Sequence, residues 1–306
     1  MGPRETSPVE TAACPVCSHA GTPVYIQRDL LCSVGGEFGQ RHCPDCGLFF
    51  LSPRVPEEDI GRYYPASYLP YRPAPTNGLL HKLAVAWGLP FRRRKILERF
   101  AAAGRILDVG CGNGSFLGTL QPDRWERHAM DIAQYCQFDG DVRFHAGRFD
   151  REMPPLSGQL DAITLWHVFE HLYNPRRALQ HAAELLAEGG FLLLAIPDLQ
   201  CIERRLFGKA WAGWDAPRHV ATYSPKSLEI LLAGAGLRLV SVVPDYCGGR
   251  QLALNIEMAL RAAGVEQNLN QSVVLQAALT PLAELSWMRA SRVAVSVTGL
   301  GREVTE

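Results

Sequence analysis

A strand that breaks into a glycine loop constrains this chain more than any other feature. Residues 106–116 read ILDVGCGNGSF, an apolar run with one acid, Asp108, and glycines at alternate positions, Gly110, Gly112 and Gly114. Glycine is needed where the backbone must take a positive φ or where a ligand comes against it. A strand, a glycine turn and a helix N-terminus together form a nucleotide-type pocket. We therefore predict a nucleotide-binding loop with a helix directly after it.

An acidic residue beyond the loop supports this prediction. Asp131 ends a short apolar run, ERHAMDI, seventeen residues after Gly114. An acid at the tip of the second strand of a nucleotide fold can accept hydrogen bonds from both ribose hydroxyls. The dinucleotide pattern G-x-G-x-x-G fits poorly, because its third glycine falls on Ser115. A solvated loop acid is the alternative for Asp131, and a plain turn is the alternative for the loop.

Strand-like and helix-like segments alternate after the loop. Residues 160–172 and 189–198 contain near-continuous apolar runs, which are typical of strands covered on both faces. Between these runs, Asn174-Pro175 is typical of a helix start and Gly189-Gly190 of a helix stop. This alternation predicts a doubly wound parallel α/β sheet.

Composition narrows the class of partner and the compartment. The 306-residue chain has 31 basic and 31 acidic residues, and neutrality argues against a polyanion as the main partner. The cations at 92–95 lie in a predicted amphipathic helix over 79–100, where they are expected to form a solvated face. No signal peptide is expected, because the first residues, MGPRETSPVET, are polar and lack an apolar core. No transmembrane helix is expected, since no apolar run reaches 18 residues. Nine cysteines without a secretion signal favour reduced thiols in a cytoplasm.

Two pairs of cysteines near the amino terminus have the spacing of a metal site. Cys14 and Cys17 form one C-x-x-C pair, and Cys43 and Cys46 form another after 25 intervening residues. Four thiolates complete a tetrahedron and close the coordination shell of a structural Zn²⁺. We predict a zinc-ribbon module over 1–51, with a redox pair or a relic without metal as the alternatives. Three further donors are expected to be bystanders: His19, Cys32 and His42.

Residues 105–243 resemble the class I S-adenosylmethionine (SAM) dependent methyltransferases, including ubiquinone-pathway O-methyltransferases. The resemblance lies in ILDVGCGNGSF, in HVFEHLYNP at 167–175 and in WDAPRHVATYSPKSLEILLAGAGL at 214–237. The cysteine-rich leader, followed by CGLFFLSP, is similar to that of zinc-containing sugar C-methyltransferases. The resemblance implies a seven-stranded Rossmann-like sheet and SAM as the co-substrate.

The same resemblance assigns residues to the co-substrate. In the family, the first strand and the glycine loop hold the methionine part of SAM, the acid after the second strand takes the ribose, and the pair Arg148-Phe149 lies where the adenine is flanked. A packed core phenylalanine is an equal alternative for Phe149. The residues assigned in this way are Asp108, Gly110, Cys111, Gly112, Asp131, Arg148, Phe149 and Trp166.

Histidines after the fourth strand are candidates for chemistry, because ligands occupy the carboxyl ends of parallel strands. His167, Glu170 and His171 lie at i, i+3 and i+4, which puts them on one face of a helical turn. We predict that His167 and His219 face the acceptor as a base or an orienting group. A second metal site is an alternative, since some relatives bind a metal through E-x-x-E-H. Bracing of the loop by Glu170 and His171 is another.

The chain is expected to have three parts. A Pro/Tyr-rich strap over 52–78 follows the ribbon, and the methyltransferase domain occupies 79–306. Helices over 250–263 and 271–289 are expected as an insertion between the last two strands. Because their apolar residues lie on more than one face, we predict that 245–290 form a lid over an apolar acceptor. Packing over the sheet edge or a homodimer interface is the alternative.

The function most consistent with these features is methyl transfer from SAM to a small-molecule acceptor, by in-line displacement on oxygen or carbon. A natural product, a lipid or a quinone-like molecule is expected as the acceptor. Such a protein has to align acceptor, methyl and sulfur and to exclude water. An RNA base methyltransferase with a zinc-ribbon reader and a non-catalytic SAM-binding scaffold are the alternatives.

Overall fold

The described residues form two compact units. The computed structural model describes residues 8–65, 88–134, 138, 140–245, 249–265, 267, 269, 272–283 and 291–298. One unit, named the ribbon unit, comprises Met1–Pro65, Pro197–Leu228 and Asp245–Ser291. The other, named the sheet unit, comprises Ala66–Ile196, Glu229–Pro244 and Arg292–Glu306.

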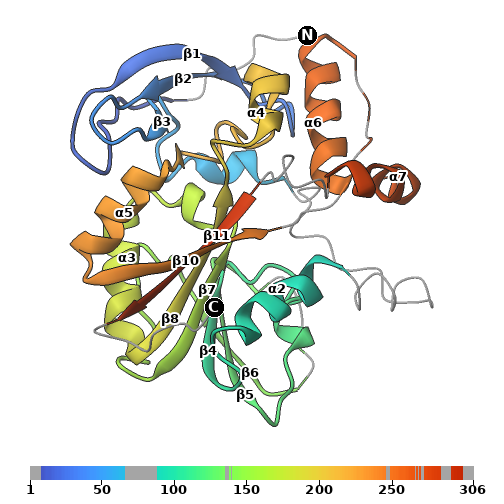
Figure 1. Ribbon diagram of the computed structural model, residues 1–306. Coiled ribbons are helices and arrows are strands. Elements are labelled where there is room, and N and C mark those ends of the chain that lie inside the picture. The colour runs from blue at the N-terminus through green and yellow to red at the C-terminus, as the bar shows by residue number, and fades with distance from the viewer. Residues whose placement is uncertain are drawn as a thin grey trace. The chain divides into compact units, whose positions relative to one another are not determined.

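The sheet unit is built on a large β-sheet. Within its described residues, seven strands follow the order β10-β11-β8-β7-β4-β5-β6 (Figure 1). The strands β4 and β5, β5 and β6, β4 and β7, and β7 and β8 pair in parallel. The predicted seven-stranded Rossmann-like sheet is confirmed. The strand bounds are β4 (Gly104–Val109), β5 (Trp125–Asp131), β6 (Val142–Ala146), β7 (Leu160–Trp166), β8 (Leu186–Pro197), β10 (Leu237–Asp245) and β11 (Ser291–Thr298).

The strand order positions a ligand site. The chain leaves β4 for β5 on one side, and β7 pairs with β4 on the other side. In open α/β sheets, ligands bind at the carboxyl ends of the strands where the strand order switches in this way. The loops after β4, β5 and β7 are therefore expected to form the site.

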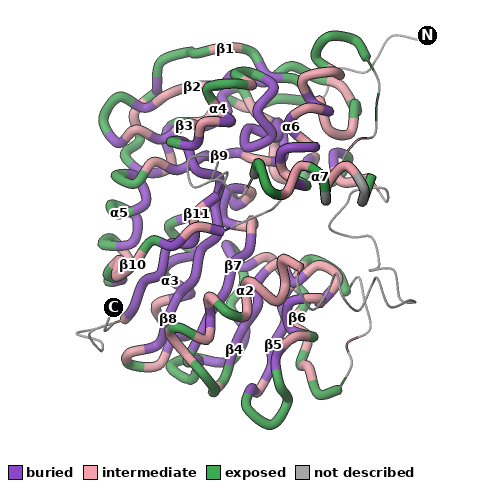
Figure 2. The backbone as a smooth tube through the Cα atoms, turned by 45° about the vertical axis from the view of Figure 1, so that its right-hand side comes forward, coloured by how far each residue is buried: buried purple, intermediate pink, exposed green. Residues whose placement is uncertain are grey.

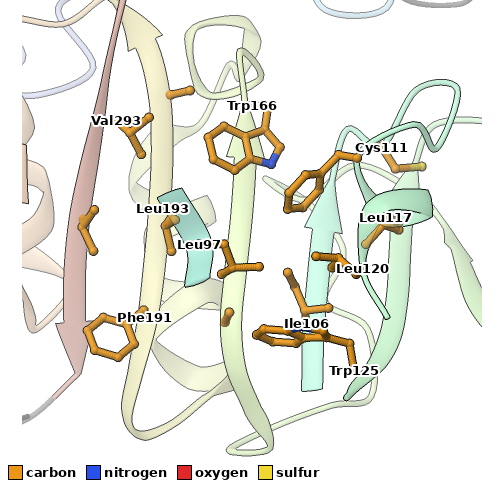
Figure 3. Packing of buried hydrophobic residues seen from close by; sticks show 14 of the residues in the cluster. Leu97, Ile106, Cys111, Leu117, Leu120, Trp125, Trp166, Phe191, Leu193 and Val293 are labelled. Carbon is orange, nitrogen blue, oxygen red and sulfur yellow. The ribbon is translucent and has the colours of Figure 1, made fainter. Parts of the chain in front are cut away.

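The hydrophobic core covers both faces of this sheet. Consecutive strand residues point to opposite faces, and Leu192, Leu193 and Leu194 of β8 are all fully buried. Figure 2 shows the buried carboxyl-terminal parts of β7 and β8, where the last five residues of β7 and the last eight of β8 are buried. On one face, Leu97 from helix α2 (Leu89–Glu98) lies over the sheet between Leu193 and Ile106 (Figure 3). Burial on both faces explains the near-continuous apolar runs in the sequence.

The helix predicted to follow Asn174 is present. In α3 (Pro175–Leu185), the Asn174 side chain accepts a hydrogen bond from the Arg177 amide at 3.1 Å, so that it caps the helix. The helix ends four residues before the predicted glycine stop. Leu186 instead begins β8 by pairing with Leu160.

No α-helix follows the glycine loop directly, in contrast to the prediction. The described residues after the loop form turns and a short 3-10 helix, η3 (Leu117–Thr119). Gly114 has a φ of +71°, a left-handed conformation that a right-handed helix cannot include, and Leu120 returns to extended backbone. The loop is therefore shaped by its glycines and not by a helix N-terminus.

The ribbon unit contains a small antiparallel sheet in the order β1-β2-β3-β9. The cysteine-rich segment supplies β1 (Thr22–Arg28), β2 (Glu37–His42) and β3 (Phe49–Leu51). The fourth member, β9 (Ala221–Thr222), comes from the segment that follows β8. It pairs with β3, so one sheet joins two distant parts of the chain.

The helical insertion predicted between the last two strands is confirmed, and its helices belong to the ribbon unit. Helix α6 (Gly249–Ala262) packs with α7 (Val273–Ala283), α4 (Ile202–Phe207) and η5 (Gly208–Ala210). Pro281 lies inside α7 as expected. Residues 284–289 of the predicted second helix lie outside the described residues. Whether 245–290 act as a lid stays a prediction.

Other parts of the predicted organisation are described only in part. The described portion of the strap over 52–78 includes η1 (Ile60–Tyr63), and its residues 66–78 lie outside the described residues, as do 79–87 of the first predicted helix. Helix α5 (Pro225–Gly234) precedes β10. The division into 1–51, 52–78 and 79–306 stays a prediction. Among the helices that the structure describes, none has both the length and the apolar character needed to cross a membrane.

Candidate functional site

The glycine loop after β4 has a backbone conformation that favours glycine. Gly110 and Gly112 have φ values of +67° and +52°, which other residues rarely adopt. A Cβ atom on Gly110 would collide with the Val168 side chain. The Gly110 amide donates to the Met130 carbonyl at 2.7 Å, so the loop is fixed to the end of β5. Glycine is therefore required here by both conformation and space.

Asp131 ties this loop to the end of β5. Its two carboxylate oxygens accept hydrogen bonds from the amides of Gly112, at 2.9 Å, and Ile132, at 2.8 Å. Burial raises the pKa of Asp131 above its ordinary value, and the two amide hydrogen bonds counteract that rise. Each carboxylate oxygen has a second lone pair, so the fixed carboxylate can still accept two hydroxyl donors.

Asp108 is a second, fully buried acid at the end of β4. The Thr164 hydroxyl donates to it at 2.6 Å. Burial raises the pKa of Asp108 to about 7, while the Thr164 hydrogen bond and the charge of Arg93 lower it and Asp131 adds to the rise. The charge of a carboxyl group with such a pKa changes near neutral pH, so the charge at this edge of the sheet depends on pH.

Arg93 is a candidate site residue that the sequence patterns did not indicate. It comes from α2, and its guanidinium lies over the Trp166 ring, 4.9 Å from the ring centroid. It is also close enough to Asp108 to lower the pKa of that acid. The neighbouring Arg94 donates to the Thr119 carbonyl at 2.9 Å. Instead of forming only a solvated face, this run of cations contributes a positive charge beside the glycine loop.

Trp166 and Cys111 lie at the same end of the sheet (Figure 3). Both belong to the core, and the Trp166 ring meets the edge of Phe116 at a centroid distance of 5.2 Å. The Trp166 indole nitrogen is buried and has no hydrogen-bond partner in the described part of the chain. Their assignment to the co-substrate stays a prediction.

Arg148 and Phe149 follow β6. Phe149 is buried, its ring meets the edge of His181, and its carbonyl accepts a hydrogen bond from the His181 Nδ1 at 2.7 Å. Arg148 lies 3.5 Å from Asp150 and over the ring of Tyr173. The buried ring has the core packing that was the alternative for Phe149, and the role of the pair beside an adenine stays a prediction.

His167 directly follows β7 in a strained conformation. Its φ is +59°, and its amide donates to the Ala195 carbonyl at 3.0 Å. Its Nδ1 lies 3.2 Å from a carboxylate oxygen of Glu170, which is fully buried in the 3-10 helix η4 (Phe169–His171). An ionised Glu170 accepts a hydrogen bond from Nδ1 of a neutral His167, and in that state Nε2 has the lone pair. Glu170 thus braces His167 and sets its tautomer.

His219 belongs to the ribbon unit, whereas His167 belongs to the sheet unit. The His219 Nδ1 donates to the Gly213 carbonyl at 2.9 Å, which again leaves the lone pair on Nε2. The His219 amide donates to the Asp215 carbonyl at 3.1 Å. The roles of the two predicted catalytic histidines stay predictions.

The four predicted metal ligands come together in the ribbon unit. Ligand atoms of Cys14, Cys17, Cys43 and Cys46 all lie within 4.8 Å of one another. The Sγ–Sγ distances include 3.5 Å for Cys14–Cys46, 3.2 Å for Cys17–Cys43 and 3.9 Å for Cys17–Cys46. Zn–S bonds of about 2.3 Å in a tetrahedron require sulfur atoms about 3.8 Å apart. The cluster fits a structural zinc ion.

Comparison with known proteins agrees with this geometry. Residues 82–242, more than half of the chain, match the family described as methyltransferase domain. The chain is similar to the ubiquinone biosynthesis O-methyltransferase of Caulobacter sp. (strain K31), with 27% identity over 125 residues, 35% of this chain and 50% of that protein. Against the ubiquinone biosynthesis O-methyltransferase of Xanthomonas axonopodis pv. citri (strain 306), identity is 25% over 169 residues, 50% of this chain and 71% of that protein.

A solved structure is also similar. The crystal structure of a SAM-dependent methyltransferase from Archaeoglobus fulgidus gives a TM-score of 0.47 at 18% identity, with 72% of this chain and 100% of that chain covered. The alignment with the Caulobacter protein spans half of that protein's length.

The family match includes the features that form the candidate site. It extends from the segment of α2 through the glycine loop, Asp131 and His167 into β10. The resemblance to SAM-dependent methyltransferases, which the glycine loop first indicated, is confirmed. The chain belongs to the methyltransferase domain family.

Proposed function

We propose that this chain transfers a methyl group from SAM to a small-molecule acceptor. The observation that carries the proposal is the arrangement of Asp131, whose carboxylate is fixed by amides of two loops at the carboxyl ends of adjacent strands. A carboxylate held in this way is preorganised to bind the two hydroxyls of a ribose. Family membership supports the reaction class.

The residues around the glycine loop fit the remaining parts of SAM. Gly110 and Gly112, whose positive φ values shape the loop, are proposed to let the amino-acid part of SAM lie against the backbone. The guanidinium of Arg93 supplies a positive charge for a carboxylate, and the buried Asp108 offers an acceptor for an ammonium group. SAM itself supplies a methyl group already activated on a sulfonium, so the protein has to orient the acceptor and exclude water.

The acceptor side is proposed to use histidine. His167 and His219 each keep a lone pair on Nε2, so either can take the proton of an acceptor hydroxyl while the methyl–sulfur bond breaks and the methyl–oxygen bond forms. For a carbon acceptor, the same atom would take the proton lost from carbon. Histidine is the side chain most often used as a general base at neutral pH.

A small-molecule acceptor is favoured over RNA. The chain carries 31 basic and 31 acidic residues, and its two named relatives are ubiquinone biosynthesis O-methyltransferases. A quinone-like or lipid-like phenol is therefore the first acceptor class to try. We also propose a structural zinc ion in the cysteine cluster, where metal analysis of chelator-free protein should give about one equivalent.

A turnover assay tests the proposed function. The purified chain, supplied with SAM and fractions of a small-molecule extract, should form S-adenosylhomocysteine, and activity should survive RNase treatment. Asp131→Ala should abolish most of this activity at low SAM, whereas Asp123→Ala, an exposed acid before β5, should retain it. Binding of SAM without turnover on any extract would support a scaffold, and loss of activity with RNase would support an RNA substrate.

A further inference from the structure

We propose that the ribbon acts as an internal clamp for the loop that carries His219, and that this is the use of its sheet edge and metal site. The loop comprises residues 211–224 and is named the 211–224 loop. The inference rests on the proposed roles of zinc and His219, and goes beyond them by giving the ribbon a partner within its own chain. That partner replaces a nucleic acid or a second protein.

The first observation is that the ribbon sheet is completed by this loop. Thr222 and Ala221 of β9 pair with Phe49 and Phe50 of β3. The Leu51 amide extends the ladder by donating to the Val220 carbonyl at 3.0 Å. Figure 2 shows β9 beside β3. The β3 edge of the ribbon, which would otherwise offer unpaired amides and carbonyls to a partner, is thus occupied by the residues directly after His219.

The second observation concerns the metal-binding turn itself. The Ser224 hydroxyl donates to the carbonyl of Cys46 at 2.8 Å, and Lys226 donates to the carbonyl of Asp45 at 2.6 Å. Gly47 has a φ of +75°, and a Cβ atom there would come within 3.0 Å of the Ser224 hydroxyl. The backbone of the second cysteine pair is therefore in direct contact with the carboxyl-terminal end of the 211–224 loop.

The third observation is a buried ion pair on the other side of His219. The guanidinium of Arg218 is fully buried, and it contacts Asp29 at 2.8 Å and Asp215 at 2.6 Å and donates to the Tyr63 carbonyl at 2.9 Å. Asp29 belongs to the ribbon loop after β1, where it also accepts the amides of Cys32 and Val34. Arg218, the residue before His219, is thus attached to the ribbon loop through Asp29.

Aromatic packing provides a fourth attachment. The Trp214 ring is buried between two ribbon side chains, with centroid distances of 5.9 Å to Tyr25 and 5.2 Å to Phe49. Its indole nitrogen donates to the Gly208 carbonyl at 3.0 Å, and Trp211 meets it edge-on at 5.0 Å. The ribbon therefore contacts Trp214, the residue next to Gly213, whose carbonyl sets the tautomer of His219.

We therefore expect zinc to affect acceptor binding by holding His219 in position. The metal holds the turn that contacts Ser224, and that turn and β3 hold the segment that places His219. When the metal leaves, the glycine loop and Asp131 keep their own hydrogen bonds, because these are made within the sheet unit. Metal loss should therefore change His219 and the acceptor site before it changes SAM binding.

Hydrogen exchange of the intact chain tests the clamp without relying on activity. After removal of zinc by a chelator, amides at 213–223 should exchange about tenfold faster or more, while amides of β4 and β5 should change by less than about twofold. Restoring Zn²⁺ should restore the protection. Unchanged exchange at 213–223 after complete metal loss would overturn the clamp. RNA binding that a chelator abolishes, while the contacts between the ribbon and the 211–224 loop persist, would also overturn it.

Two variants test the attachment with the metal in place. Ser224→Ala and Asp29→Asn should each raise exchange at 213–223 and raise the KM for the acceptor by about tenfold, with zinc content and the KM for SAM within about twofold. Glu37→Gln, in an exposed ion pair with Arg28 of the same ribbon, is the matched control. Should Asp29→Asn fail to fold, Ser224→Ala still decides. If the chain proves inactive, the proposed function fails while the exchange measurement still tests the clamp.

Discussion

The glycine loop and the 211–224 loop are held by contacts of very different range. The Gly112–Asp131 hydrogen bond joins residues 19 positions apart, one in the loop after β4 and the other at the end of the adjacent strand β5. Arg218 reaches Tyr63 and Asp29 over 155 and 189 positions. One loop is shaped by its own glycines, the other by distant parts of the chain that must fold around it. The first should therefore tolerate changes in the ribbon, whereas the second should not.

The largest expected effect is on the buried ion pair of the 211–224 loop. Arg218→Met leaves Asp29 and Asp215 buried without their cation, which should lower the free energy of unfolding of the ribbon unit by about 3–5 kcal/mol. Urea unfolding followed by hydrogen exchange would measure it. Arg28→Met removes an exposed pair and should cost at most about 1 kcal/mol. Equal small losses in both variants would contradict the proposed contrast between the loops.

A pH experiment sharpens the comparison through two buried acids. Burial raises the pKa of Glu203 in the ribbon unit to about 7, and the Asn255 side chain, which donates to it at 2.6 Å, counteracts that rise. In the unfolded chain, Glu203 ionises near pH 4.5. The contribution of Glu203 to folding stability is therefore lost as the pH rises from about 4.5 to about 7. Glu203→Gln removes this dependence, worth on the order of 3 kcal/mol above pH 7.

The matched comparison for Glu203 is Asp108→Asn in the sheet unit, where burial also raises the pKa to about 7. Asp108→Asn should also weaken SAM binding, because Asp108 and the nearby Arg93 are proposed to contact the amino-acid part of SAM. Stability curves from about pH 5 to about pH 8 would measure both variants. If Glu203→Gln shows the same pH slope as the parent chain, the assignment of a buried neutral Glu203 is wrong.

The histidines should produce an effect on turnover. If either acts as the base, His167→Ala or His219→Ala should lower kcat by about 100-fold, or about 2.7 kcal/mol, with the SAM affinity nearly unchanged. Steady-state kinetics and calorimetry measure the two quantities. Full turnover in both variants would mean that the acceptor is oriented by shape alone.

The smallest effect is expected from a histidine pair on β5 and β6. His128 and His145 stack, with ring nitrogens 3.0 Å apart, and burial lowers the pKa of both. Because the folded chain disfavours their charged forms, the free energy of unfolding should fall as the pH drops below about 6.5. His145→Gln should flatten this fall. An identical acid slope in that variant would remove the pair from the account.

Local patterns explain what was predictable from the sequence. Short sequence patterns are sufficient to predict some local structures. Examples are two glycines with positive φ, the capping Asn174 and the two C-x-x-C pairs. The same holds for the buried strands, whose apolar runs follow from burial on both faces. These features indicated the sheet, the cysteine cluster and the methyltransferase family before any tertiary contact was known.

What could not be predicted depends on long-range contacts. The two-residue strand β9 has no pattern of its own and exists because β3 pairs with it. Arg93 lies among four consecutive cations, and only the packing of α2 decides which one meets Trp166. Arg218 looks like an ordinary surface cation until Asp29 and Asp215 surround it. Each of these residues takes its role from a partner that the sequence does not mark.

The central claim is that the loop after β4 and the acid after β5 bind SAM. Titration calorimetry of the purified chain with SAM tests it most directly, with Asp131→Ala as the variant and Asp123→Ala as the control. We predict saturable binding of SAM by the parent chain. Binding should weaken by about 10- to 150-fold in Asp131→Ala, because that variant loses a charge-assisted pair worth about 1.5–3 kcal/mol. It should stay unchanged in Asp123→Ala. Equal SAM affinity in all three proteins, or no binding by the parent chain, would contradict it.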